Sequence, residues 1–170
     1  QFYHLGMRVV VTGLVGQYPF GGVIWDYLQY LLGFRSLGHE VLYLEDSGAW
    51  PYDPVAGTIT DDCSFALRSL KKIFSDFDLP DAWVYRNGAD GKFYGAGESK
   101  ARDWLRHAEL LVNVSSAGWL RGMAGEWTTS VVAAGGAAPS ARISAPRAAR
   151  ASRWSCPARS LPDTVQPASR

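Results

Sequence analysis

Hydrophobic positions at the start of the chain fall into two continuous runs separated by a run with helical spacing. Arg8 to Thr12 is rich in β-branched residues and Glu40 to Leu44 is almost entirely apolar, which is typical of parallel strands buried on both faces. Between them, apolar residues recur every three or four positions from Val23 to about Leu37, which predicts an amphipathic helix. A strand, a helix and a second strand in this order form a βαβ unit, so we expect a parallel sheet.

The same alternation continues with shorter elements as far as Val114. We predict an α/β fold, specifically a Rossmann-like three-layer domain with a mostly parallel sheet of about four strands and helices on both faces. The remaining predicted elements are a helix from about Asp61 to Phe77, a strand from Ala82 to Arg86, a hairpin arm at 92–94, a helix from about Glu98 to His107 and a strand from Glu109 to Val114.

Residues near the ends of the predicted helices indicate how each helix begins and stops. Gly38 follows the first helix and is expected to form a left-handed cap, while Asp26 is placed in the first turn, where a carboxylate favours the helix dipole. Thr60 or Asp61 is expected to cap the second helix. The segment from Trp50 to Gly57 contains two prolines and is predicted to be a loop.

Composition changes sharply after Arg121. Of the 49 residues from 122 to 170, twelve are Ala, seven Ser, five Pro and six Arg. Such a segment buries too little apolar surface to offset the entropy of ordering, so we expect disorder, with only 128–134 able to form a strand or a short helix. We therefore divide the chain into an N-terminal extension (1–6), an α/β domain (7–121) and a low-complexity tail. Translation of GC-rich DNA in a wrong frame gives this composition, so we hypothesise that the native reading frame is lost shortly after Arg121. The alternative is a natural low-complexity tail.

Charge, hydropathy and cysteine content exclude several classes of function. The domain at 7–121 carries eleven basic and fourteen acidic residues, which gives no electrostatic support for nucleic-acid binding. No run approaches the roughly 18 apolar residues of a transmembrane segment, and no secretory signal is visible. Cys63 and Cys156 lie far apart and form no metal-binding spacing, so we expect no metal site and a cytoplasmic location.

Glycines after the first strand are the main candidate binding residues. Gly13 and Gly16 are similar to the start of a dinucleotide-binding motif, but Pro19 stands where its third glycine would be. Gly21 and Gly22 open the predicted helix, where backbone amides and the positive end of the helix can face a phosphate or a sugar hydroxyl. We therefore predict substrate binding at Gly16, Gly21 and Gly22, and the alternative is a tight strand-to-helix turn without a ligand.

Polar residues at the ends of other strands are further candidates. Asp46, next to Glu45, ends the second strand on the edge of the sheet that binds ligands, where it could accept hydrogen bonds from sugar hydroxyls; the alternative is a solvated loop acid. Ser115 and Ser116, with Asn113, end the last strand and are expected in the same cleft. No Ser/His/Asp set and no metal cluster can be assembled, so the catalytic residues stay unassigned.

Aromatic residues flank the glycines and are considered as a stacking wall for a sugar or a base. Core or surface packing is the alternative for most of them. They are Tyr18, Phe20, Trp25, Tyr27 and Tyr30.

The run Phe20-Gly21-Gly22-Val23, followed by a helix that ends in Leu37-Gly38-His39-Glu40-Val41, resembles the opening of bacterial glycosyltransferases with two facing Rossmann-like domains (GT-B-type). The resemblance covers roughly 7–121. It implies that this domain binds a sugar-type acceptor, and that a nucleotide-sugar donor is held chiefly by a second domain, which this chain does not contain. The family's donor-binding glutamate motif has no counterpart here. The resemblance therefore implies a truncated chain that is inactive alone and has no cofactor of its own.

Two other functions remain open at this stage. A divergent NAD(P)-binding oxidoreductase or epimerase domain would also use a glycine loop after the first strand. A non-catalytic α/β module would instead bind a partner protein through an exposed sheet edge or helix face.

Overall fold

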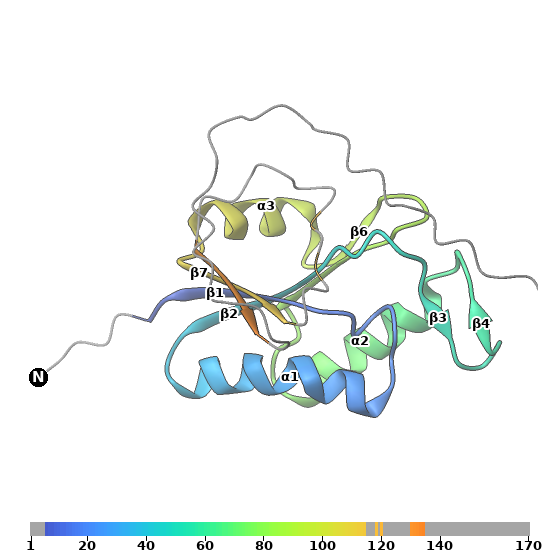
Figure 1. Cartoon of the computed structure of the whole chain (residues 1–170), viewed down its shortest axis with the longest axis horizontal. Helices are drawn as coiled ribbons and strands as arrows, with labels where there is room; N and C mark the ends of the chain where they lie inside the picture. The colour runs from blue at the N-terminus through green and yellow to red at the C-terminus, as the bar shows by residue number, and fades with distance from the viewer. Residues whose placement is uncertain (1–5, 115–117, 119, 121–129, 135–170) are drawn as a thin grey trace, which may run out of the picture.

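The computed structural model describes residues 6–114, 118, 120 and 130–134, and these form a six-stranded sheet with helices on both faces (Figure 1). The order of strands is β6-β5-β2-β1-β7-β8, in which β6 alone is antiparallel to its neighbour. The strands of this sheet are β1 (Arg8–Thr12), β2 (Glu40–Glu45), β5 (Trp83–Arg86), β6 (Phe93–Gly95), β7 (Leu110–Val114) and β8 (Ser130–Ala134).

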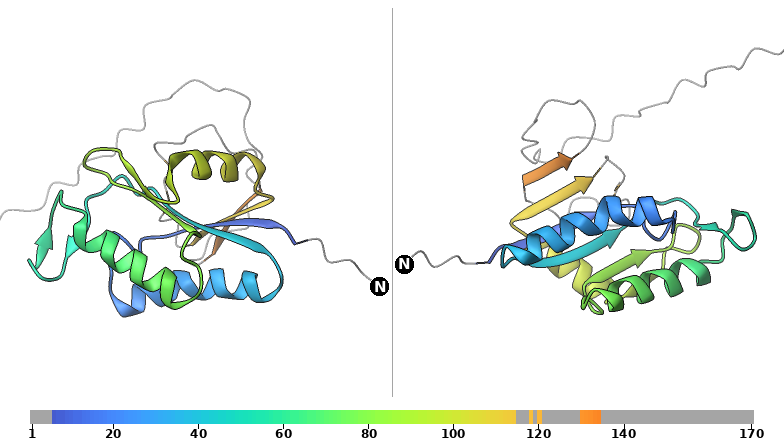
Figure 2. Two further views of the ribbon diagram at one scale, coloured as in Figure 1. Left: turned by 180° about the vertical axis from the view of Figure 1, so that it is seen from behind. Right: turned by 90° about the horizontal axis from the view of Figure 1, so that it is seen from below.

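The described residues form three helices. Two of them cover one face of the sheet and the third covers the other (Figures 1 and 2). Helix α1 (Gly21–Ser36) packs on β1 and β2, and α2 (Ser64–Asp76) packs on β5. Helix α3 (Gly97–His107) contacts β1, β5 and β6 from the opposite face. A separate two-stranded hairpin, β3 (Tyr52–Asp53) and β4 (Thr58–Ile59), extends from the end of the molecule near α2.

Strand β1 contributes side chains to the hydrophobic cores on both faces of the sheet. Val9, Val10 and Val11 are fully buried, because alternate side chains point to opposite faces and both faces are covered. Val9 and Val11 join the core under α1 and α2, whereas Val10 joins the core under α3. Each such buried side chain stabilises the fold by roughly 1.5–3 kcal/mol relative to an exposed one.

The predicted α/β class, with a mostly parallel sheet and helices on both faces, is confirmed. The sheet has more strands than the four that we expected, because the hairpin arm forms β6 and residues 130–134 form β8. These five residues belong to the segment 122–170 that we expected to be disordered, within the stretch that could form a strand. The rest of that segment and the extension 1–5 lie outside the described residues.

Several details of the helix ends differ from the predictions. Helix α1 begins at Gly21, so Asp26 lies in the second turn and not in the first. Helix α2 begins at Ser64, and Asp62, not Thr60 or Asp61, accepts a hydrogen bond from the Ser64 amide over 2.8 Å. The predicted loop at 50–57 contains β3, a strand of only two residues. The left-handed cap at Gly38 is confirmed, with φ of 85°.

Within the described part of the chain, none of the helices has the length and apolar character needed to cross a membrane.

Candidate functional site

The carboxyl ends of β1, β2 and β7 lie at one edge of the sheet, and Asp46 directly follows β2 there. β1 lies between β2 and β7, and the chain leaves β1 towards α1 on one face but reaches β7 from α3 on the other face. In open α/β sheets, ligands bind in the crevice at such a reversal of strand order. The loop from 13 to 20 starts at this point.

Glu45, the last residue of β2, fastens this loop from inside the protein. Its carboxylate is fully buried and accepts hydrogen bonds from the backbone amides of Gly16 and Gln17, each over 2.7 Å. The Tyr43 hydroxyl donates to the same carboxylate over 2.6 Å and accepts from the Val15 amide over 2.9 Å. The three consecutive amides of the loop are therefore all bonded to side chains of β2.

Burial raises the pKa of Glu45 to about 7, although the hydrogen bonds from Tyr43, Gly16 and Gln17 act in the opposite direction. Burial and the nearby Glu45 carboxylate also raise the pKa of Tyr43 well above its usual value. The loss of hydration raises the pKa of Glu45 by more than the three hydrogen bonds lower it. The groups that shift this pKa include no cation that would stabilise the charged form.

Gly16 lies in the interior of the protein and not at its surface. A Cβ atom at this position would come within 2.8 Å of the Tyr85 ring, so the loop can pack here only with glycine. The structure therefore gives Gly16 a clear internal role, in which its amide holds Glu45. The Tyr85 hydroxyl is itself buried without a hydrogen-bond partner in the described structure.

Gly21 and Gly22 lie at the surface, in the first turn of α1. A Cβ atom on either glycine would have open space around it, and neither has the positive φ that requires glycine. The N-cap residue, Phe20, makes no capping hydrogen bond through its side chain. The first-turn amides of a helix have no acceptor within the helix, so this turn presents donors to the surroundings.

Asp46 is buried, and the alternative of a solvated loop acid is wrong. Its carboxylate accepts a hydrogen bond from Arg86 over 3.1 Å, with side-chain exposures of 0% for Asp46 and 22% for Arg86. Its backbone carbonyl accepts from the Leu120 amide over 3.1 Å. The Arg86 guanidinium lies over Phe93, which packs against the core on the α3 side. Asp46 thus ties β5 and the segment after β7 to the end of β2.

Asn113 and Thr12 close the same edge between β1 and β7. The Thr12 hydroxyl donates to Asn113 Oδ1 over 3.0 Å, and the same oxygen accepts from the Gly118 amide over 3.0 Å. The Asn113 amide nitrogen donates to the Gly118 carbonyl over 3.0 Å. A Cβ atom at Gly118 would meet the Thr12 side chain, which accounts for glycine at this position. Ser115 and Ser116, which we expected in this cleft, lie outside the described residues.

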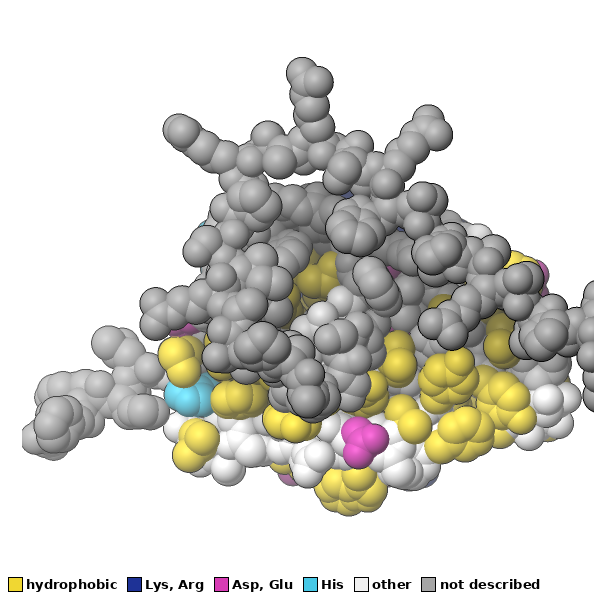
Figure 3. All heavy atoms as spheres, in the orientation of Figure 1, with side chains coloured by type: hydrophobic (Ala, Val, Ile, Leu, Met, Phe, Trp, Pro, Cys, Tyr) yellow, Lys and Arg dark blue, Asp and Glu magenta, His cyan; other side chains and the backbone are white. Residues whose placement is uncertain are grey.

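The aromatic residues near the glycines do not form one wall. Tyr27 is buried in the core, and Trp25 packs edge-on against Phe77 with 5.6 Å between ring centroids. Phe20 is 44% exposed and its ring lies 5.3 Å from that of Tyr52 in β3. Phe20 directly precedes Gly21, so this pair lies next to the start of α1. Figure 3 shows hydrophobic side chains at the surface near α1 and near the end of the molecule that carries β3.

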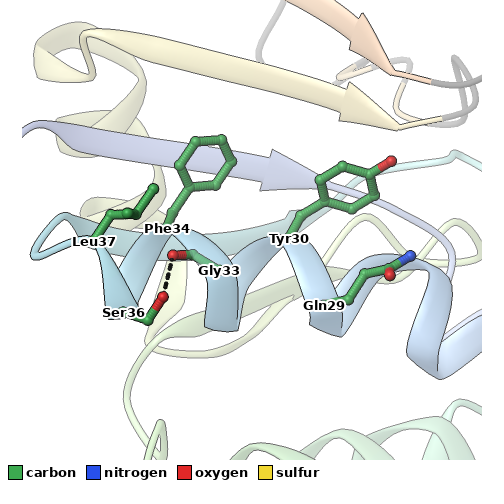
Figure 4. Close-up of a pocket in the computed structure, with 6 residues that line it drawn as sticks. All are labelled: Gln29, Tyr30, Gly33, Phe34, Ser36 and Leu37. Carbon is green, nitrogen blue, oxygen red and sulfur yellow. Dashed lines mark hydrogen bonds between the residues drawn. The ribbon is translucent and has the colours of Figure 1, made fainter.

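An open groove of about 390 Å³ lies along the second half of α1, away from the predicted site residues (Figure 4). Tyr30, Phe34 and Leu37 point from the helix towards the strands and form its apolar side. The Ser36 hydroxyl is bonded to the Gly33 carbonyl over 2.8 Å. The groove therefore offers few polar groups to a ligand.

Comparisons with protein-family models, with curated proteins and with solved structures find no significant match to this chain. Among the described residues, no three His, Cys, Asp or Glu side chains lie close enough together to hold a metal ion.

Proposed function

We propose that this chain is the acceptor-side domain of a GT-B-type glycosyltransferase, and that its sheet has the Rossmann-like arrangement of that family. The proposed reaction is transfer of a sugar from a nucleotide-sugar to a sugar-type acceptor held against the first turn of α1. The resemblance of 20–23 and 37–41 to the opening of these enzymes supports the family. The reversal of strand order at β1 supports a ligand site at the adjacent loop.

The presence of Gly21 and Gly22 in the first turn of α1 is the observation that carries the proposal. Glycine disfavours a helix, and neither residue is needed for packing or for backbone conformation in the described structure. A ligand that approaches the backbone closely would require both. The amides of this turn can donate to acceptor hydroxyl groups, and the Phe20 ring beside them offers an apolar surface to a sugar ring.

Neither carboxylate at the end of β2 is placed to act as the general base of an inverting reaction. Glu45 is enclosed by the loop that it holds, and Asp46 is paired with Arg86. A general base must lie within hydrogen-bond reach of the acceptor hydroxyl. The proposed role of the described domain is therefore to bind and orient the acceptor.

The alternative of a dinucleotide-binding domain is disfavoured by the position of Glu45. In that class of protein, backbone amides of the glycine loop face the pyrophosphate. Here the amides of Gly16 and Gln17 are already bonded to a carboxylate of the same chain. A phosphate at the same position would have to displace the buried Glu45 side chain.

An NMR titration of the full chain tests the proposal. Methyl glycosides and uridine diphosphate glucose are added separately, and NAD is added in a third titration. We expect glycosides to shift the amide signals of Gly21 and Gly22, and expect Gly22→Val to abolish this effect. Gly33→Val is the matched control, because Gly33 is also exposed in α1 with open space around it. Glycoside binding that Gly22→Val leaves intact, or quenching of tryptophan fluorescence by NAD, would contradict the proposal.

A further inference from the structure

We propose that the acceptor carries an apolar group beside its sugar, and that an exposed apolar face of the β3–β4 hairpin binds this group. The inference rests on the proposed function and specifies the class of acceptor as neutral glycosides with an aryl or alkyl substituent. We define the hairpin face as Phe20, Tyr52 and Ile59. Val55 lies in the turn between the two strands, and Trp50 lies just before β3.

Large apolar side chains on the described surface concentrate at this hairpin. Six large hydrophobic residues are exposed in the described part of the chain, and four of them belong to this region. They are Phe20, Trp50, Val55 and Ile59. Figure 3 shows hydrophobic side chains gathered at the end of the molecule that carries β3. Because contact of apolar surface with water is unfavourable, a patch of this kind indicates a surface that binds something.

The hairpin face is continuous with the first turn of α1. Tyr52 and Ile59 are directly opposite each other in the antiparallel pair, so their side chains lie on one face of the hairpin. The Tyr52 ring lies 5.3 Å from the ring of Phe20, which directly precedes Gly21. A substituent on a sugar bound at the first turn can therefore lie on the hairpin face.

Hydrogen bonds hold the hairpin in this position. The Tyr52 amide donates to the Gln17 carbonyl over 2.8 Å, which joins β3 to the loop before α1. In the turn, the Asp53 carboxylate accepts from the amides of Val55 and Ala56 over 2.7 and 3.2 Å. Because the hairpin is fixed in the absence of a ligand, binding on this face loses little conformational entropy.

Charge and size favour a small molecule without negative charge as the occupant. Residues 50–62 include Asp53, Asp61 and Asp62 but no Lys, Arg or His, and the loop 13–20 has no charged residue. These acids repel a phosphorylated acceptor or an anionic membrane surface. In a symmetric dimer through this face, the same acids would meet their own copies. A stable protein interface also needs roughly 20–30 residues from each partner, far more than this patch supplies.

NMR titration of the full chain with methyl β-glucoside and with hexyl β-glucoside below its micellar concentration tests the proposal. The dissociation constants come from the amide signals of Gly21 and Gly22. Complete burial of the additional methylenes of the hexyl chain would strengthen binding roughly 700-fold. An open face covers about half of such a chain, so we expect hexyl glucoside to bind about 25-fold more tightly than methyl glucoside.

Two matched variants locate the apolar contact. Ile59→Thr keeps a β-branched residue in β4 and shortens the apolar side chain, so it should reduce the preference for hexyl glucoside several-fold. Leu37→Thr changes another exposed apolar residue, beside the groove at the far end of α1, and should leave the preference unchanged. Equal binding of the two glucosides, or a preference that is lost in Leu37→Thr and kept in Ile59→Thr, would overturn the inference.

The failure of this inference differs from the failure of the proposed function. If both glucosides bind equally well and Gly22→Val abolishes their binding, the hairpin face is not part of the site but the proposed function is supported. If Gly22→Val leaves the binding of hexyl glucoside unchanged, the chain binds the alkyl group without the sugar, and both proposals are contradicted. A dimer in sedimentation equilibrium that Ile59→Thr dissociates, or binding to phosphatidylcholine vesicles that this variant abolishes, would assign the face to another occupant and overturn the inference.

Discussion

The ion pair between Asp46 and Arg86 gives the sharpest test of how the carboxyl edge of the sheet is held together. Arg86→Met keeps most of the apolar stem of the side chain and removes the guanidinium. The Asp46 carboxylate, which has no exposure to solvent, then loses its ion pair with Arg86. Removal of one partner from a buried pair destabilises a protein by about 3–5 kcal/mol. Because Arg86 is 22% exposed, we expect the lower end of this range, about 3 kcal/mol.

The assay is urea unfolding of the full chain followed by tryptophan fluorescence. Asp46→Asn should be less harmful, at about 1–2 kcal/mol, because the partly exposed guanidinium of Arg86 can be hydrated whereas the carboxylate cannot. Lys72→Met is the control, since it breaks an exposed pair with Asp76 on α2 and should cause no measurable loss. If Arg86→Met were no more harmful than Lys72→Met, or milder than Asp46→Asn, the reasoning from burial would be refuted.

Three further predictions concern the stability of the domain. Because folding raises the pKa of Glu45, the contribution of this group to stability is complete below about pH 4.5 and is lost as pH rises through about 7. Over that interval the free energy of unfolding should fall by about 3 kcal/mol relative to that of Glu45→Gln. Denaturant unfolding at each pH measures this difference. Gly22→Ala and Gly33→Ala should each stabilise the protein by about 0.5–1 kcal/mol in thermal unfolding, and a loss of stability at Gly22 would mean that its glycine has a structural role. Asn113→Ala leaves the Gly118 amide without its acceptor and should lower the free energy of unfolding by about 1–3 kcal/mol. Thr12→Val removes only one hydrogen bond to Asn113 and should lower it by less, if Asn113 is the centre of this network.

The order of elements could be predicted from the sequence because each depends on a local pattern. The β-branched run of β1, the helical spacing of α1 and the glycine at 38 are read without knowledge of the rest of the fold. The antiparallel strand β6 was also predicted as a hairpin arm, since turn residues precede it. The hairpin of β3 and β4 was missed, because its strands have two residues each and carry no periodic signal.

The candidate site was harder to predict because it depends on the face of the sheet to which each side chain points. Asp46, next to Glu45, was expected at a ligand-binding edge, yet both carboxyl groups are bonded within the protein. A signal for the role of Glu45 was present: Tyr43 and Glu45 are two positions apart in a strand, so they share a face. What no local pattern could show is that this face meets the loop after β1.

The two adjacent acids at the end of β2 therefore hold different segments at this edge of the sheet. Glu45 holds the loop before α1 through backbone amides, whereas Asp46 holds Arg86 and the segment that contains Leu120. Each is satisfied within the protein, so a ligand at this edge must find its partners elsewhere. The first turn of α1 remains, where two exposed glycines leave the backbone accessible. Because this turn follows the loop that Glu45 holds, the two hydrogen bonds from the Gly16 and Gln17 amides to that buried side chain also help to position the proposed binding surface.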